Sequence, residues 1–170
     1  MKTCLCANGT EMKKHLHSCI VLIQLYATLM SMNPEMLPRQ LKVLELPFNR
    51  QLGIVYDGVA DSTTKSHFLS TPELATFDGY LHGGVLSAVF EVAGFLALVP
   101  HLADSQHAVT HDLHVSFMRS IATGARCDLC ASVSRLGRTL AFLEVTAFVD
   151  GKLVASARIT KSITVLNNSQ

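Results

Sequence analysis

Residues 82–98 read HGGVLSAVFEVAGFLAL, a long apolar stretch that opens with a Gly-Gly pair and contains a single acid. That acid, Glu91, is the only charged side chain between Val85 and Val99. A helix that is apolar around its whole circumference is typical of a buried helix. The stretch therefore predicts a central helix that ends at Pro100 and that other elements cover on every side.

Two groups in this stretch suit chemistry on a carbonyl. Burying the Glu91 carboxylate costs free energy unless a partner compensates for it. Glycines at a helix start leave backbone N–H groups open to a negatively charged oxygen. An acid and an oxyanion site are the two groups that acyl transfer needs. Structural interpretations stay open as well, because Glu91 can reach solvent and the glycines can serve only close packing of helix against sheet.

The composition is that of one domain with a large core. The chain has 170 residues, of which 49% are hydrophobic and 16% are charged, and its net charge is +1. So little charge predicts that part of the surface is buried in a homo-oligomer. The chain has no basic run or acidic tail, so we expect no nucleic-acid partner.

Residues 1–31 differ in character from the rest of the chain. A Lys-Lys pair at 13–14 precedes an apolar run from Cys19 to Met30, which resembles a signal-peptide core. The run is short for a membrane span, which needs about 20 apolar residues. Three interpretations stay open: a helix packed on the domain, a targeting or anchoring segment, or a non-natural leader before Met30, Met32 or Met36. We therefore divide the chain into an extension over 1–31 and a domain over 32–170, and expect a cytoplasmic protein without a membrane partner.

Strand patterns flank the central helix on both sides. A short helical stretch opens at Asn33-Pro34-Glu35 and ends before Pro47. A strand pair follows over Leu52–Ala60 and Lys65–Leu69, joined by a turn at 61–63. After the helix, further strands are expected at Ala108–Met118, Arg126–Ser134, Thr139–Val149 and Lys152–Ile163. The last two form a hairpin across Asp150-Gly151, a strong turn signal.

This order of elements predicts an α+β fold. It places five or six antiparallel strands around one long helix, and the sheet must curl to cover that helix. In the strand Ala108–Met118, simple alternation assigns Val109, His111, Leu113, Val115 and Phe117 to one face. The same alternation assigns the other face to Thr110, Asp112, His114, Ser116 and Met118.

The cysteines and histidines predict no metal site. Cys127 and Cys130 have the spacing of a zinc or redox motif, but they fall in a predicted strand, where positions three apart face opposite sides. No second cysteine pair follows them. The spacings of four further residues match no standard zinc pattern: His101, His107, His111 and His114.

At this point the chain resembles the hotdog-fold acyl-CoA thioesterases. The similarity is to the phenylacetate-pathway branch of the 4-hydroxybenzoyl-CoA thioesterase-like superfamily, and it covers about residues 33–163. It rests on five blocks in this order: Gly79–Gly84, Glu91 nine residues after His82, Ala108–Asp112, Arg135–Phe142 and Asp150–Ala155. The resemblance implies a hotdog fold, hydrolysis of acyl-CoA to acid and coenzyme A, and a homodimer or dimer of dimers with active sites at the subunit interface.

The resemblance also implies roles for five candidate catalytic residues. Glu91 acts as general base or nucleophile, and the backbone N–H of Gly83 polarises the thioester oxygen. His82 either caps the helix or takes part in proton transfer. Thr76 stands where relatives usually have Asn or Gln, and its hydroxyl is shorter than an amide. Thr110 matches a Ser or Thr that lies near the site from the partner subunit.

Candidate substrate-binding residues complete the assignment. The loop 135–140 matches the stretch that meets coenzyme A, and guanidinium groups suit its phosphates because they fork onto paired oxygens. The candidates are Gly84, Phe95, Phe117, Arg135, Gly137, Arg138 and Thr139. No metal or separate cofactor is implied, since coenzyme A is part of the substrate.

Two other functions fit the same fold. A non-catalytic acyl-CoA-binding domain would keep the coenzyme A loop without needing the acid, and Glu91 counts against it while Thr76 counts slightly for it. A hotdog dehydratase or hydratase would carry a catalytic histidine in a His-Phe-Pro-Gly-like loop, and the sequence contains no such loop. The acyl group itself stays open, because Phe90, Phe95 and Phe117 suit an aromatic or a fatty pocket equally.

Overall fold

The computed structural model describes residues 38–165, and the predicted extension over 1–31 lies outside them. One six-stranded antiparallel sheet, in the order β1-β2-β4-β5-β6-β3, curves around the long helix α4. The helices are α2 (Pro38–Glu45), α3 (Pro47–Leu52) and α4 (Gly83–Leu98), with short 3₁₀ turns η1 (Pro72–Leu74) and η2 (Val99–His101). The strands are β1 (Val55–Ala60), β2 (Thr63–Leu69), β3 (Gln106–Phe117), β4 (Arg126–Leu136), β5 (Leu140–Val149) and β6 (Lys152–Val165). The predicted α+β architecture is confirmed.

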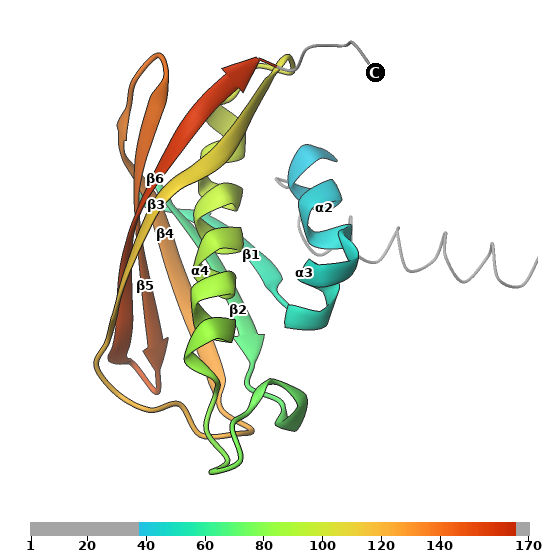
Figure 1. Cartoon of the computed structure of the whole chain (residues 1–170), viewed down its shortest axis with the longest axis vertical. Coiled ribbons are helices and arrows are strands. Elements are labelled where there is room, and N and C mark those ends of the chain that lie inside the picture. The colour runs from blue at the N-terminus through green and yellow to red at the C-terminus, as the bar shows by residue number, and fades with distance from the viewer. Residues whose placement is uncertain (1–37, 166–170) are drawn as a thin grey trace, which may run out of the picture. The chain divides into compact units, whose positions relative to one another are not determined.

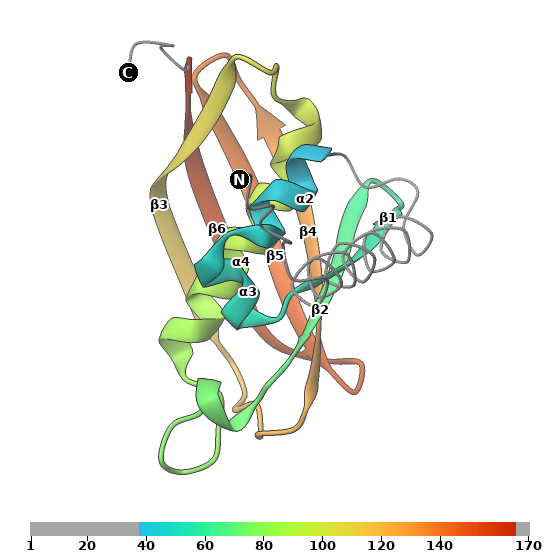
Figure 2. The same ribbon diagram turned by 90° about the vertical axis from the view of Figure 1, so that its right-hand side faces the viewer.

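Helix α4 lies between two layers, as Figures 1 and 2 show. The sheet covers one side, and α2 and α3 cover part of the other. Side chains along α4 are buried all round, including Val89, Phe90, Ala93 and Leu96, each with no exposed surface. The buried amide of Gln40 on α2 donates to the Leu96 carbonyl at 2.8 Å, which fastens α2 to the helix. An apolar helix that is covered in this way is the one the sequence predicted.

The turns follow the sequence signals closely. Asp61 and Ser62, with φ angles of 50° and 59°, join β1 to β2. Asp150 and Gly151 join β5 to β6 at 50° and 72°. Positive φ at two consecutive turn residues matches the right-handed twist of the strands. The first strand begins later than predicted, because Leu52 ends α3 and Gly53 caps that helix in the left-handed conformation.

Strand β3 departs from the predicted alternation. Its pairing with β6 shifts register between Thr110 and Asp112, so His111 is the extra residue of a β-bulge. A bulge reverses the phase of alternation beyond it. Thr110 therefore faces α4 together with Leu113 and Val115, which pack against the core. The predicted assignment of Thr110 and Leu113 to opposite faces is wrong for this reason.

The stretch Gly83–His101 has the length and composition of a membrane span when it is considered alone. Within the described residues it is the one helix with these properties, and more than half of it is buried inside the fold. The sheet and the α2–α3 layer already occupy its sides. These features are those of the core helix of a globular domain.

Gly94 sets how closely α4 approaches the sheet. A Cβ atom at this position would meet Ile159 Cδ1 at 3.0 Å and Leu143 Cδ1 at 3.4 Å. Gly94→Val should therefore lower the free energy of unfolding by about 1–3 kcal/mol, the usual cost of overpacking. Urea denaturation of both proteins measures the difference. An unchanged unfolding midpoint would show that the sheet yields at this contact without cost.

Candidate active site

The Glu91 carboxylate is held by two side chains from the sheet. Thr110 on β3 donates from Oγ1 to Glu91 Oε2 at 2.5 Å, and Lys161 on β6 donates from Nζ to the same oxygen at 2.7 Å. Lys161 also donates to Thr110 Oγ1 at 2.8 Å, which closes a triangle. The other carboxylate oxygen, Oε1, is buried and has no hydrogen-bond partner among the described residues. One oxygen is therefore fixed in place and the other is left for a further group.

Lys161 was not predicted as a site residue. It is 3% exposed, a rare position for a lysine unless its charge is paired. The signal lies in the alternation of β6, where Ala157, Ile159 and Lys161 share the buried face. A lysine in phase with core residues of a strand indicates an acidic partner across the core, and Glu91 is that partner.

Glu91, Thr110 and Lys161 line a cavity of about 410 Å³. Apolar side chains form most of its remaining wall, from α2 and α3, from α4 and from β3. They include Leu46, Phe48, Val92, Phe95 and Val109. The Phe95 ring meets the His107 ring edge to face, with centroids 5.8 Å apart, and Lys161 Nζ lies 5.5 Å from the Phe95 centroid. The cavity thus combines an apolar wall with a charged triangle.

The start of α4 carries the second predicted group. His82 is the N-cap, and its Nδ1 accepts the N–H of Gly84 at 3.0 Å. This contact gives His82 the capping role that was one of its two interpretations. Within residues 38–165 no acceptor lies against the Gly83 N–H, the first N–H of the helix. That donor remains available to a ligand.

A second cavity, of about 340 Å³, opens at this helix start. Gly83 lines it together with Phe117 and Leu81. The Phe117 ring packs on Gly83, since a Cβ at that position would lie 3.5 Å from the ring. Phe117 therefore belongs to the Gly83 cavity, and Phe95 belongs to the Glu91 cavity.

The two halves of the predicted site are separate within one chain. Gly83 and Glu91 lie eight residues apart on one helix, which corresponds to about 12 Å along its axis. A carbonyl that accepts from Gly83 is then out of reach of a carboxylate at Glu91. Thr110, by contrast, bonds to Glu91 in the same chain.

The remaining predicted residues line neither cavity. Thr76 lies in the loop before α4, where its backbone N–H donates to the Tyr80 carbonyl at 2.7 Å. Of the other predicted residues, Arg135 is an exposed residue near the end of β4, and the exposed turn between β4 and β5 contains Gly137, Arg138 and Thr139. Their backbone is ordered by hydrogen bonds from Gly137 to Leu140 and from Ile163 to Thr139, each of 2.8 Å.

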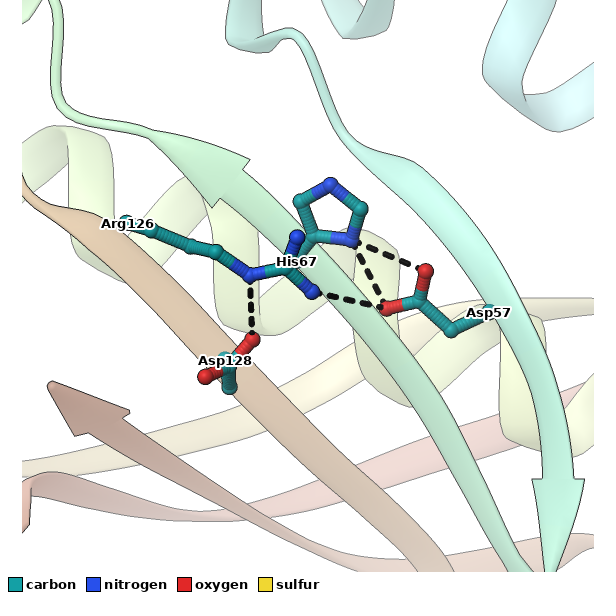
Figure 3. Close-up of polar contacts among 4 residues, drawn as sticks. All are labelled: Asp57, His67, Arg126 and Asp128. Atoms are coloured by element: carbon teal, nitrogen blue, oxygen red, sulfur yellow. Dashed lines mark hydrogen bonds and ion pairs between the residues drawn. The ribbon is translucent and has the colours of Figure 1, made fainter. Parts of the chain in front are cut away.

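A second polar cluster lies on the sheet face that points away from α4. Figure 3 shows His67 from β2 against Asp57 from β1, with Nδ1 2.7 Å from Oδ2. Arg126 bonds to Asp128 along β4 at 2.8 Å and lies 3.8 Å from Asp57. Each carboxylate has a His or Arg partner, and none of the four residues lines either of the two cavities described above. We interpret this cluster as a structural ion-pair network.

The cysteine pair behaves as its strand position predicts. Cys127 is fully buried and Cys130 lies on the opposite face, where Lys65 donates to its sulfur at 3.1 Å. Burial, assisted by the charge of Asp128, raises the pKa of the Cys127 thiol to about 12. A thiol that stays protonated at neutral pH is a poor nucleophile and metal ligand.

Comparison with known proteins finds a similarity to one family over part of the domain. Residues 78–160 match the thioesterase superfamily. The matched range contains Gly83, Glu91 and Thr110, along with the whole β4–β5 turn. No curated protein sequence matches the chain.

Solved structures agree with this match. A putative thioesterase of Ralstonia eutropha, described as phenylacetic acid degradation-related, shares 27% identity over 69% of this chain and 90% of its own, with a TM-score of 0.65. A variant of the phenylacetic acid degradation protein PaaI of Thermus thermophilus shares 27% identity over 68% of this chain and 97% of its own, at 0.62. A thioesterase of Haemophilus influenzae, 22% identical over 76% of this chain and 91% of its own, has the same fold at 0.70. The predicted resemblance and hotdog fold are confirmed, and the matches support thioester hydrolysis as the general chemistry.

Proposed function

We propose that this protein hydrolyses acyl-CoA thioesters that carry an apolar acyl group, with Glu91 as general base or nucleophile. One observation carries the proposal: Glu91 lines an apolar cavity, and Lys161 and Thr110 hold its carboxylate there. A carboxylate in that position suits either a water molecule to be deprotonated or the carbonyl carbon itself. The apolar wall suits an acyl chain or ring.

The reaction needs an oxyanion donor as well as the acid. When hydroxide or the carboxylate adds to the thioester carbonyl, negative charge develops on the carbonyl oxygen. The free N–H of Gly83, at the positive end of the α4 dipole, suits that charge. Collapse of the tetrahedral intermediate then breaks the C–S bond and releases coenzyme A as a thiolate, which takes up the proton that Glu91 removed from water. If the carboxylate itself attacks, collapse instead leaves a mixed anhydride on Glu91, and a water molecule hydrolyses it to the free acid. No metal or separate cofactor takes part in this proposal.

A second copy of the chain would bring these groups together. Strand β3 is an edge of the sheet, and its Val109 and Phe117, with the adjoining Met118, are 48–55% exposed. An unpaired apolar edge is a template for pairing with another strand. Antiparallel pairing centred near Leu113 and His114 would set the Thr110 end of one β3 beside the Phe117 end of the other. The Glu91 cavity of one protomer would then adjoin the Gly83 cavity of its partner.

A thiol-release assay tests the proposed function. Purified protein is offered aromatic, short, medium and long acyl-CoA thioesters, and free thiol is measured with time. We expect turnover with at least one apolar acyl group. Tight binding of acyl-CoA without release of thiol would instead support the non-catalytic acyl-CoA-binding alternative.

Arg138 should contribute to coenzyme A affinity more than to chemistry. It is exposed in the β4–β5 turn beside Gly137, where its side chain can reach phosphates at the surface. Arg138→Ala should raise KM several-fold, because one charge-assisted hydrogen bond contributes about 1.5–3 kcal/mol before solvent screening reduces it. The assay compares an acyl-CoA with a truncated thioester that lacks the nucleotide. Equal losses on both substrates would assign Arg138 a structural role.

A further inference from the structure

We infer that Lys161 is the positioning residue of the site: it bonds to Oε2 of Glu91 and thereby holds the carboxylate in its working orientation. The inference rests on the proposed thioester hydrolysis and deepens it. Lys161 carries three N–H donors. One bonds to Glu91 Oε2 and another to Thr110 Oγ1, at 2.7 and 2.8 Å. The first bond holds Oε2 directly, and the second holds Thr110, which itself donates to the same oxygen.

The hydrogen-bond inventory around Glu91 is unequal between its two oxygens. Oε2 accepts from Lys161 and from Thr110, whereas Oε1 accepts from no group in the described part of the chain. The position of the carboxylate is therefore set through Oε2, by Lys161 and Thr110 together.

Lys161 suits this role because its side chain is buried and its backbone is paired on both sides. It is 3% exposed, and its backbone lies inside the sheet, where β6 pairs with β3 on one side and β5 on the other. Its Cα neighbours are Thr110 on β3 and Ala141 on β5. A lysine on a central strand has far less freedom than one on a loop, so the carboxylate that it holds is pre-organised.

The bulge at His111 is what makes the triangle possible. It lets Thr110 face α4 directly opposite Lys161, so that the hydroxyl both donates to Glu91 and accepts from the ammonium. The side chain of Thr110 thus has its donor and one acceptor site used within the triangle. Thr110 supports the same carboxylate oxygen as Lys161 but carries no charge.

Kinetics of Lys161→Met test the inference, since methionine keeps the length of the side chain and removes its charge and donors. We expect kcat for the best acyl-CoA to fall at least ~10-fold, while KM changes by less than about threefold. A fall in kcat at a nearly constant KM distinguishes positioning of the carboxylate from a role in substrate binding.

A matched control comes from the other face of the sheet. Lys65 on β2 is a half-buried strand lysine, and it donates to Cys130 rather than to an acid. Lys65→Met should leave kcat and KM unchanged. If Lys161→Met does not fold, Lys161→Gln replaces it, with a fall in kcat at constant KM again expected.

A double variant separates positioning from direct contact with substrate. In a Glu91→Gln background, adding Lys161→Met should change the residual rate by less than about twofold, because Lys161 acts through the carboxylate. An additional tenfold loss in that background would overturn the inference and give Lys161 a contact of its own with substrate. An unchanged kcat in the single variant would also overturn it. Absence of thiol release by the unmodified protein would instead refute the proposed function itself.

Discussion

Glu91→Gln should lower kcat for the best acyl-CoA by at least ~100-fold, the lower end of what a positioned acid or base contributes. The amide keeps the shape of the side chain, and its oxygen can still accept from Lys161 and Thr110. What it loses is the ability of the carboxylate to take a proton or to attack a carbonyl carbon. KM should change far less than kcat, because the apolar wall of the cavity is untouched.

The measurement is thiol release together with thermal unfolding of the purified variant. Glu144→Gln is the matched control, because Glu144 is an exposed acid on β5 that lines no part of the Glu91 cavity. The control should keep the kcat of the unmodified protein. Near-normal hydrolysis by a folded Glu91→Gln variant would remove Glu91 from the reaction.

Gly83→Pro should reduce kcat by ~100-fold or more, since removing one oxyanion donor from an acyl-transfer site has an effect of that size. Proline suits the first position of a helix, where its missing N–H breaks no intrahelical bond. The preceding residue, His82, already has the extended conformation that proline demands, with φ −67° and ψ 130°. The substitution therefore deletes one donor from a backbone that can accept it.

Gly83→Ala separates the donor from the added side chain. Its Cβ would lie at ordinary contact distance from the Phe117 ring, and its N–H is kept. The loss in kcat should be at least tenfold smaller than for Gly83→Pro, because the oxyanion donor survives. Equal losses in the two variants would point to crowding against Phe117 and would remove the N–H from the mechanism.

The same two variants test whether the site is shared between protomers. Co-expression of Glu91→Gln and Gly83→Pro chains with different tags allows the hybrid dimer to be purified. In a hybrid with two composite sites, one site keeps both groups and the other has neither, so about half of the unmodified turnover should return. A hybrid as inactive as its parents would show that each site lies within one chain, contrary to the proposed dimer.

Local sequence patterns were enough to predict the central helix α4, the six strands and the order in which they follow one another. The apolar run before Pro100 predicts α4, because a helix that is apolar around its whole circumference is buried in the core. The Asp150-Gly151 pair defines the β5–β6 hairpin because both residues adopt positive φ. The same kind of local pattern indicated Glu91 as a candidate site residue, because it is the one charged residue in an apolar helix. These signals are short-range, so a single sequence carries them.

What surrounds Glu91 depends on contacts between distant residues, and only the tertiary structure decided it. The bulge at His111 adds one residue to β3 and turns Thr110 toward the helix, a shift of phase that the alternation of β3 does not reveal. Lys161, 70 residues from Glu91, reaches it only because β6 lies next to β3 in the sheet. Gly83 and Glu91, close in sequence, are held about 12 Å apart by the rise of their own helix. The sequence by itself determined which elements form and which groups are chemically capable, because those properties are local, whereas strand pairing and helix geometry decided which of these groups meet.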